Sequence, residues 1–379
     1  MAGGAEIHSD RRLPALTGLR IAAALAVYAS HIGAPAGSPA FLQAFFASGY
    51  CGVTVFFVLS GFVLAFNYFE DMRQPSLGSA YDFFVARFAR VYPLYLLVLL
   101  YVVLHEHASG VDVDLWWQHA LALQAWDASD AHAYAFNGPG WSIGVEFFLY
   151  ACFPLLVPLV AKLRTPRALL GAAAIVALAM CALVAWFVVS GKGDLSWLDP
   201  ASAHRWLYRT PLTRLGDFVL GMLAARAFVQ IGGRGAVVRL CRLLAPAAAA
   251  LIVLEMAWPS LTFSAWSWDV AYAAPGVVLI FALASAPAGW LARGLSLPFV
   301  VLLGEASYAF YLVHSPAISF LGAGQWDSGV SGSLIALEAL NLGVILAVAV
   351  GLHLTVERPA RRHIRRLLSR RPKPAPVAA

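Results

Sequence analysis

The run LPALTGLRIAAALAVYASHIG, residues 13–33, decides the fold. It is apolar along almost its whole length, and about 20 such residues form a helix long enough to cross the hydrocarbon core of a bilayer. Its ionisable side chains are Arg20 and His31. A helix is expected because a segment surrounded by lipid must satisfy its own backbone hydrogen bonds.

Similar runs fill the rest of the chain. Of the 379 residues, 61% are hydrophobic and 12% are charged, whereas about a quarter of the residues in a soluble domain are charged. We therefore predict an all-α, polytopic integral membrane protein with about ten transmembrane helices. The runs of roughly spanning length lie at residues 13–33, 49–68, 85–105, 141–161, 168–190, 211–229, 243–258, 270–291, 297–320 and 333–356.

Lys and Arg residues predict the orientation. Most of them fall on one side of the membrane, and cytoplasmic loops are the ones enriched in these residues. Both termini are therefore expected in the cytoplasm, which places the longest loops, 106–140 and 191–210, outside. The basic residues that fall on the outer side are Lys192, Arg205, Arg209 and Arg214.

Three parts of the chain are expected. Residues 1–12 form a cytoplasmic N-terminal segment, 13–358 a transmembrane domain and 359–379 a basic, Pro-rich cytoplasmic tail. Arg11 and Arg12 also resemble the start of a secretory signal, but Arg20 interrupts the apolar run and further spans follow, so we expect a retained span. Segment 114–126 is apolar but too short to cross, and is expected to lie in the interface or re-enter the membrane.

The charge and the cysteines exclude other classes of protein. The net charge of +6 comes from residues between apolar runs, which indicates topology rather than nucleic-acid binding. The four cysteines show no CxxC or Cys/His spacing, so neither a metal nor a redox site is predicted.

Arg20 and His31 form the first polar pattern within a span. Eleven positions at about 100° each bring them within roughly 20° of one helix face, about 16 Å apart along the axis. Such a stripe is expected to face the interior of the bundle, and a histidine can accept and return a proton near neutral pH. The alternative is a histidine at the membrane interface and an arginine paired with a carboxylate.

Arg87 and Arg90 open the third span at its cytoplasmic end. Two guanidiniums at i and i+3 lie on neighbouring faces of one turn and suit the phosphates of a CoA-type donor. Simple positive-inside anchoring would also explain them.

Glu146 lies in the fourth span, with Tyr150 one turn further on the same face. The carboxylate could orient a histidine, bind a hydroxyl or pair with an arginine. In the ninth span, Tyr308, Tyr311 and His314 follow Glu305 at one-turn intervals, and could line a site or bond between helices. Gly140-x-Ser142-x-Gly144 matches the nucleophile elbow of serine hydrolases, but no strand precedes it.

Taken in order, these motifs resemble the acyltransferase 3 family of integral membrane O-acyltransferases, whose members acylate bacterial surface glycans and macrolides. The resemblance extends over nearly the whole chain, from residue 13 to residue 362. The stretches that carry it are LTGLR (16–20) with His31, FFVLSGF (56–62), RFARVYP (87–93), WSIGVE (141–146), LGEASY (303–308), LVH (312–314) and ERP (357–359).

The resemblance implies roles for particular residues. Arg20 and His31 would form the family's R-x10-H signature, with His31 as the essential catalytic residue, and Arg87 and Arg90 would serve the acyl-CoA. The sequence departs from the family at Thr17, where Asp is frequent, and at Gly144, where a small polar residue is common.

We therefore hypothesise an O-acyltransferase of the bacterial inner membrane. It would transfer an acyl group, acetyl by family resemblance, from acyl-CoA to a hydroxyl of a carbohydrate or other glycan or secondary-metabolite acceptor. His31 would act as general base or form a transient acyl-histidine, supported by Arg20 and Glu146. Tyr150, Tyr308 and His314 are expected to contact substrate.

Two other classes stay open at this point. A proton-coupled transporter would also bury Arg, His and Glu in its spans, although no internal repeat of the kind that carriers show is found. A structural or sensory function would not explain why Arg20 and His31 share one face of the first span. Membrane lipid, acyl-CoA and a hydroxyl acceptor are the expected partners, with no nucleic acid, and the pattern is silent on oligomeric state.

Overall fold

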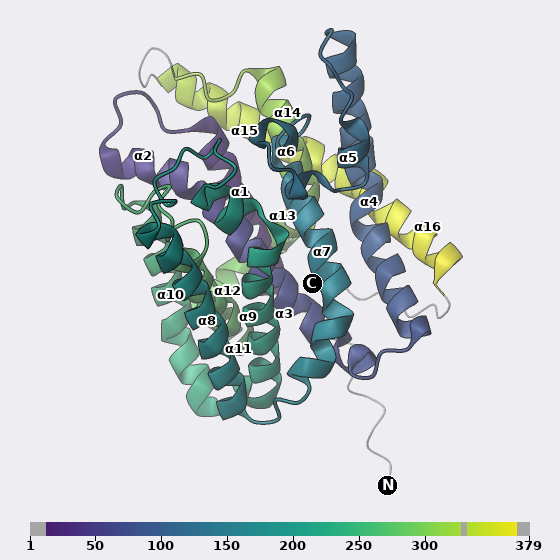
Figure 1. The fold of residues 1–379 in the computed structure, drawn as a ribbon, viewed down its shortest axis with the longest axis vertical. Helices are drawn as coiled ribbons and strands as arrows, with labels where there is room; N and C mark the ends of the chain where they lie inside the picture. The colour runs from purple at the N-terminus through teal and green to yellow at the C-terminus, as the bar shows by residue number, and fades with distance from the viewer. Residues whose placement is uncertain (1–12, 327–331, 370–379) are drawn as a thin grey trace.

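The computed structural model describes residues 13–326 and 332–369. Within those two ranges the chain is helical throughout its regular structure and contains no strand (Figure 1). The expected N-terminal segment 1–12 and the Pro-rich end of the tail, 370–379, lie outside the described residues. The all-α prediction is confirmed.

Eight helical stretches of the described chain are long and apolar enough to cross a membrane, which confirms the polytopic architecture. They contain α1 (Pro14–Ile32), α2 (Ala40–Ala47) with η1 (Ser48–Tyr50) and α3 (Cys51–Met72), α4 (Leu77–Ala108), η3 (Gly138–Gly140) with α7 (Trp141–Val160), α8 (Pro166–Val189), α9 (Pro211–Ala227) with η5 (Phe228–Gly232), α10 (Gly235–Met256), and α15 (Gly332–Leu352) with η6 (His353–Glu357) and α16 (Arg358–Leu368).

Shorter helices complete the bundle and its connections. They are α5 (Trp116–Ala120), η2 (Gln124–Trp126), α6 (Asp130–Ala133), η4 (His204–Arg209), α11 (Val270–Ser285), α12 (Trp290–Leu295), α13 (Pro298–Glu305) and α14 (Ser307–Leu321). The predicted span 270–291 is represented by α11, which is shorter than a full crossing. Segment 114–126 forms α5 and η2, with Trp116 and Trp126 exposed and His119 buried between them.

The predicted span 297–320 is not one helix. It divides into α13 and α14 at Ala306, whose ψ of −3° departs from helical geometry. The close packing of α13 on α1 accompanies this break: a Cβ on Gly304 would lie 2.0 Å from the carbonyl oxygen of Thr17. Ser307 then begins α14 and accepts a hydrogen bond from Arg20. Glu305 is thereby separated from the tyrosines that follow it.

Local signals in the sequence explain where several helices begin and end. Ser76 caps α4, because its hydroxyl accepts the backbone N–H of Ser79 at 3.1 Å in a reciprocal capping arrangement. Pro166 and Pro211 occupy the first turns of α8 and α9, where no intrahelical N–H partner is lost. Gly322 ends α14 with a φ of 63°, a conformation that costs glycine little.

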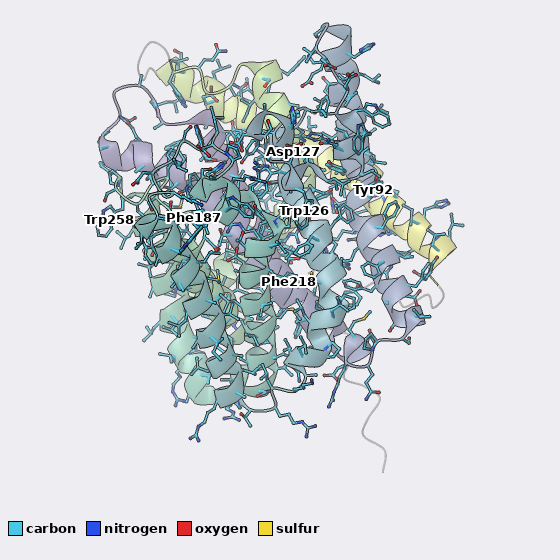
Figure 2. The ribbon with its side chains drawn as sticks, viewed as in Figure 1. Tyr92, Trp126, Asp127, Phe187, Phe218 and Trp258 are labelled. Atoms are coloured by element: carbon cyan, nitrogen blue, oxygen red, sulfur yellow. The ribbon has the colours of Figure 1, made fainter. Side chains whose placement is uncertain are left out.

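The bundle has two sides joined by α1 and α3, which run through its middle (Figure 1). On one side, α8, α9, α10 and α11 stand together; on the other are α4 and α7, with α15, η6 and α16 forming one long diagonal rod. Most of the buried side chains are apolar: Phe218 is fully buried between helices, whereas Trp258 lies at the edge and is 61% exposed (Figure 2).

Glycines permit the close crossing of α3 and α9. A Cβ on Gly61 would lie 2.0 Å from the carbonyl oxygen of Phe218, and one on Gly221 would lie 2.0 Å from that of Val58. Backbones approach this closely in membrane bundles only where small residues face each other. Ser60 and Phe57 directly precede the two contact residues Gly61 and Val58 on α3. The crossing places both at a cavity described in the next section.

Gly221→Ala is therefore expected to destabilise the protein by about 1–3 kcal/mol, since the helices must separate to admit the methyl group. The melting temperature of the purified chain in lipid nanodiscs measures this. Gly171→Ala on α8 is the matched control, because nothing lies within 4 Å of its added Cβ. Equal melting temperatures for the two variants would contradict the close crossing.

Candidate active site

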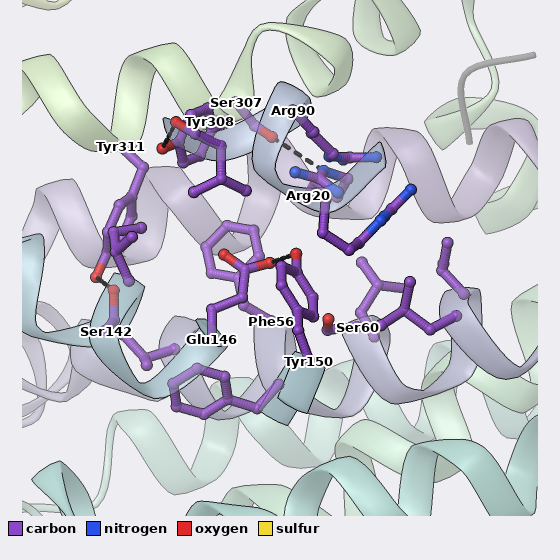
Figure 3. Close-up of a pocket in the computed structure, with 18 residues that line it drawn as sticks. Arg20, Phe56, Ser60, Arg90, Ser142, Glu146, Tyr150, Ser307, Tyr308 and Tyr311 are labelled. Atoms are coloured by element: carbon purple, nitrogen blue, oxygen red, sulfur yellow. Dashed lines mark hydrogen bonds between the residues drawn. The ribbon is translucent and has the colours of Figure 1, made fainter. Parts of the chain in front are cut away.

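Two cavities contain the polar residues of α1, the helix that the sequence marks as polar on one face. The first, called here the Arg20 cavity, is narrow, with a volume of about 70 Å³. It gathers side chains from five helices, α1, α3, α4, α7 and α14 (Figure 3). Its polar lining consists of Arg20, Ser60, Arg87, Arg90, Ser142, Glu146, Tyr150, Ser307, Tyr308 and Tyr311.

The second cavity, called here the His31 cavity, is larger, with a volume of about 530 Å³. It lies under the connections from α4 to α7, α8 to α9 and α10 to α11. Such a volume is typical of pockets for small organic ligands. Besides aliphatic residues, its lining consists of Ser30, His31, Tyr50, Asp130, Tyr134, Trp141, Trp197, His204, Tyr208, Phe263, Trp268 and Tyr311.

Three guanidiniums line the Arg20 cavity, and they are held to different degrees. Arg87 is buried, donates to the hydroxyl of Tyr68 at 2.8 Å and stacks on that ring. Arg20 donates to Ser307 at 3.2 Å. Arg90 makes no hydrogen bond or ion pair within the described part of the chain. A guanidinium without a partner in a largely enclosed site is available for an anion.

Two hydrogen-bonded pairs of side chains complete the polar lining of this cavity. Tyr150 donates to the carboxylate of Glu146 one turn earlier on α7. Ser142 and the hydroxyl of Tyr311 lie 2.9 Å apart, and both bond to the carbonyl of Pro139. Figure 3 shows the carboxylate of Glu146 and the guanidinium of Arg20 facing the same space.

His31 is oriented by its own helix and by α14. Its Nδ1 lies 2.8 Å from the carbonyl of Val27, so this nitrogen carries the proton and Nε2 has the lone pair. His314 Nδ1 lies 2.8 Å from the carbonyl of Tyr311, which leaves its Nε2 to face His31 Nδ1 at 3.4 Å. Both histidines thus take the same tautomer, and the unprotonated Nε2 of His31 is the atom suited to accept a proton.

The burial of the two histidines differs. The side chain of His31 is exposed to the His31 cavity, while His314 is fully buried behind it. The rings lie 5.0 Å apart between centroids and near perpendicular. His314 can therefore position His31 but does not line either cavity.

Tyr311 and Val53 line both cavities. They form the boundary between the space that contains Arg20 and the space that contains His31. The stripe predicted on α1 therefore borders two neighbouring cavities, with Arg20 at one and His31 at the other.

The structure brings most of the predicted site residues together. Six of them line the Arg20 cavity: Arg20, Arg87, Arg90, Glu146, Tyr150 and Tyr308. His31 lines the second cavity instead, and His314 supports it from behind. Tyr308 donates to the carbonyl of Val91 at 2.7 Å, so its hydroxyl already has a protein partner. Placement does not test the roles of these residues, which stay predictions.

Sequence reasoning did not select several residues of these cavities. Ser307 lies in the stretch LGEASY, directly before Tyr308. Tyr311, one turn from both Tyr308 and His314, was expected to line a site or bond between helices, but no substrate contact was predicted for it. Asp130, Tyr134 and His204 lie in connections, where no periodicity marks a buried side chain. Arg214 and Asp217 at the start of α9 are bonded at 3.0 Å and fully buried.

A group of polar side chains, in which the one carboxylate is paired with an arginine, closes one end of the His31 cavity. Asp130 pairs with the fully buried Arg209 at 2.9 Å, and Tyr134 lies 3.2 Å from His204 Nε2. Burial, together with the nearby Arg209 guanidinium, lowers the pKa of His204 to about 4, so this imidazole is neutral near pH 7. The group therefore presents hydrogen-bonding atoms without an uncompensated charge.

Comparison with known proteins identifies the family. Residues 13–356 match the model of an acyltransferase domain, that of the acyltransferase 3 family. The chain belongs to this family. It is an O-acyltransferase, and the alternatives of a carrier or a purely structural protein are not supported. Among its described residues, no group of three or more His, Cys, Asp or Glu is placed to hold a metal ion.

Named relatives cover most of this acyltransferase. The acyltransferase MdmB of Streptomyces mycarofaciens is 34% identical over 96% of both chains. The exopolysaccharide production protein ExoZ of Rhizobium meliloti is 27% identical over 83% of this chain and 90% of its own. A Staphylococcus aureus protein, provisionally named an O-acetyltransferase, is 22% identical over 97% of this chain, which spans 60% of that protein's length. No solved structure matches the chain.

Proposed function

We propose that this acyltransferase transfers an acyl group, acetyl by family resemblance, from acyl-CoA to a hydroxyl of a carbohydrate or related acceptor at the bacterial inner membrane. The observation that carries the proposal is the pair of cavities that contain Arg20 and His31. The first also contains Arg90, which has no partner among the described residues, the second contains an oriented histidine, and Tyr311 borders both. Two reactants can thus approach one point from opposite sides.

The donor is assigned to the Arg20 cavity. Arg87 and Arg90, the latter without a partner in residues 13–326 and 332–369, offer guanidiniums to the phosphates of acyl-CoA. The narrow cavity suits a slender thioester arm better than a ring. With the predicted orientation, this side faces the cytoplasm, where acyl-CoA is made.

The acceptor is assigned to the His31 cavity. His31 Nε2 takes the proton of the acceptor hydroxyl, whose oxygen attacks the thioester carbonyl near Tyr311. The C–S bond breaks, and the CoA thiolate leaves and takes up the proton from His31. Arg20 and Glu146 orient the donor arm and stabilise the charge that develops. An acyl-histidine formed first on His31 would give the same products.

A glycan is the preferred acceptor class. One similar protein is named for exopolysaccharide production, and the predicted outer loops form the roof of the His31 cavity. A secondary metabolite with a free hydroxyl is the other class that the family resemblance implies.

The test compares three strains fed isotopically labelled acetate: wild type, a deletion strain and one that carries His31→Ala. Mass spectrometry of surface glycans, lipid extracts and secreted metabolites is expected to find a labelled ester in the wild type alone. The compound that carries this ester identifies the acceptor. The same ester profile in all three strains would contradict acetyl transfer, and repetition with longer labelled acids would then test the acyl chain.

A further inference from the structure

The walls of the His31 cavity are dominated by aromatic rings that touch one another. The ring of Trp268 lies 4.8 Å from that of Tyr50, 5.3 Å from Tyr208 and 5.5 Å from Phe263 between centroids. Trp197 adds a ring 5.9 Å from Phe263. Tyr50 lies just before α3, and the other four residues belong to the α8–α9 and α10–α11 connections. Only the tertiary structure brings them together. We call Trp197, Tyr208, Phe263 and Trp268 the aromatic box.

A buried charge cluster holds the box in place. Arg214 donates through Nε to the carbonyl of Tyr208 at 2.7 Å and through Nη2 to the carbonyl of Trp268. Its remaining bonds go to Thr54 and to the carboxylates of Asp217 and Asp269. A fully desolvated cluster of this kind is costly to build. Here it fixes the backbone under two box residues.

The backbone of the box is also strained at one point. Phe263 has a φ of 60°, which is uncommon for a bulky residue. Its backbone N–H is held by the hydroxyl of Tyr50 at 3.2 Å. Strained residues of this kind cluster at binding sites. Phe263 keeps 47% of its surface exposed, so its ring is available to a ligand.

The polar end of the cavity is built but incompletely satisfied. His204 is 5% exposed, and its Nδ1 has no hydrogen-bond partner within the described residues. The nearest carboxylate oxygen, on Asp130, is 3.6 Å away. Buried polar atoms of native proteins usually have partners. The side chains of Tyr134, Asp130 and His204 line this end of the cavity, and such polar groups suit a ligand with hydroxyl groups.

The charge of the lining restricts the ligand further. None of the described residues that line this cavity is Lys or Arg, so an anionic group would lose its hydration without gaining a counter-charge. The carboxylate of Asp130 is already paired with Arg209, so a cationic group gains little. An uncharged ring with one apolar face and several hydroxyls fits both the box and the polar end.

We propose that the aromatic box is the acceptor subsite and takes an uncharged pyranose ring. The ring stacks on Trp197 and Phe263, the two exposed rings of the box, its hydroxyls meet the end formed by Asp130, Tyr134 and His204, and one further hydroxyl points to His31. This inference rests on the proposed function for the role of His31, but binding to the box does not require the transfer reaction.

The test measures binding without the donor. The full chain is placed in nanodiscs, free of sugar-based detergents, and titrated with methyl α-D-glucopyranoside and methyl α-L-rhamnopyranoside by saturation-transfer NMR. We expect binding of at least one of these glycosides. Trp197→Ala is expected to weaken it about 10-fold, the loss typical of removing one well-packed aromatic contact.

Trp206→Ala is the matched control. Trp206 belongs to the same α8–α9 connection, but it packs under Arg205 and does not line the cavity. Tyr134→Phe is a second variant that keeps the ring and removes one hydroxyl, and we expect it to weaken binding several-fold. Melting temperatures near that of the wild type establish that each variant is folded.

Each outcome bears on the inference. Binding of neither neutral glycoside, or equal losses in Trp197→Ala and Trp206→Ala, would overturn it. Tighter binding of the methyl glycoside of glucuronic acid, or of 2-phenylethanol, would overturn the assignment of an uncharged sugar. Thiol release from acetyl-CoA is measured separately: glycoside binding without any release refutes the proposed function but not the box, and release with another hydroxyl compound but no glycoside binding refutes only the box.

Discussion

His31→Ala is expected to lower the rate of acyl transfer by about 10²- to 10⁴-fold, the range that general-base catalysis contributes. The change removes the imidazole whose unprotonated Nε2 is proposed to accept the proton of the acceptor hydroxyl. Because the His31 side chain is exposed to this cavity, its removal leaves little unfilled core. The measurement is the initial rate of thiol release from acetyl-CoA by the purified enzyme in nanodiscs, with the acceptor identified by the labelling experiment.

His314→Gln distinguishes the proposed catalytic role of His31 from the proposed positioning role of His314. Glutamine retains an acceptor for His31 Nδ1, so we expect a smaller fall in kcat with little change in the acceptor KM. The pH dependence of kcat should shift in this variant, since the orientation and environment of His31 change, whereas a merely structural loss would lower the melting temperature. If His31→Ala transferred the acyl group at the wild-type rate, His31 would not take part in the reaction.

The two routes through His31 differ in one observable. An acyl-histidine would retain label when the enzyme is incubated with labelled acetyl-CoA and no acceptor, then quenched and digested. A general base would leave the peptide that contains residue 31 unlabelled. His31→Ala provides the background for both.

Arg90→Gln is expected to raise the KM for acyl-CoA by about 10- to 100-fold, since hydrogen bonds to charged groups contribute about 1.5–3 kcal/mol. Arg90 lines the Arg20 cavity and has no partner among the described residues. Its loss should therefore weaken donor binding while the melting temperature stays near that of the wild type. Initial rates over a range of acetyl-CoA concentrations give the measurement.

Two further variants are compared with Arg90→Gln. Arg73→Gln is the control for removing one basic charge, because Arg73 is exposed and pairs with Glu70 away from the cavity. Arg87→Gln should also weaken donor binding, but with a lower melting temperature, since Arg87 is bonded to Tyr68 and stacked on its ring. An unchanged KM in Arg90→Gln would place the donor phosphates elsewhere.

Some features could be predicted from the residues alone because the physics is local. A run such as 13–33 must be helical in lipid, where each backbone group needs a partner within the segment. The angle between Arg20 and His31 depends only on the helical repeat. Each of these residues lines a cavity in the structure, as an apolar helix with one polar face requires.

Other features depended on contacts between distant parts of the chain. The break at Ala306 accompanies the packing of Gly304 on Thr17, which no apolar count can anticipate. The number of full-length apolar helices therefore differs from the number of apolar runs. His314 acts on His31 across most of the sequence, and only the path of α14 beside α1 brings them together.

The part of the His31 cavity wall that comes from the connections between helices shows most clearly which features depend on the tertiary structure. Its residues, among them Asp130, Trp197 and His204, come from connections with neither a helical period nor an apolar run to mark them. The sequence by itself determined a helical membrane protein with an arginine and a histidine on one face of its first span. The tertiary structure alone decided that two cavities meet at Tyr311, because cavities form where side chains from separate helices fail to fill the space between them.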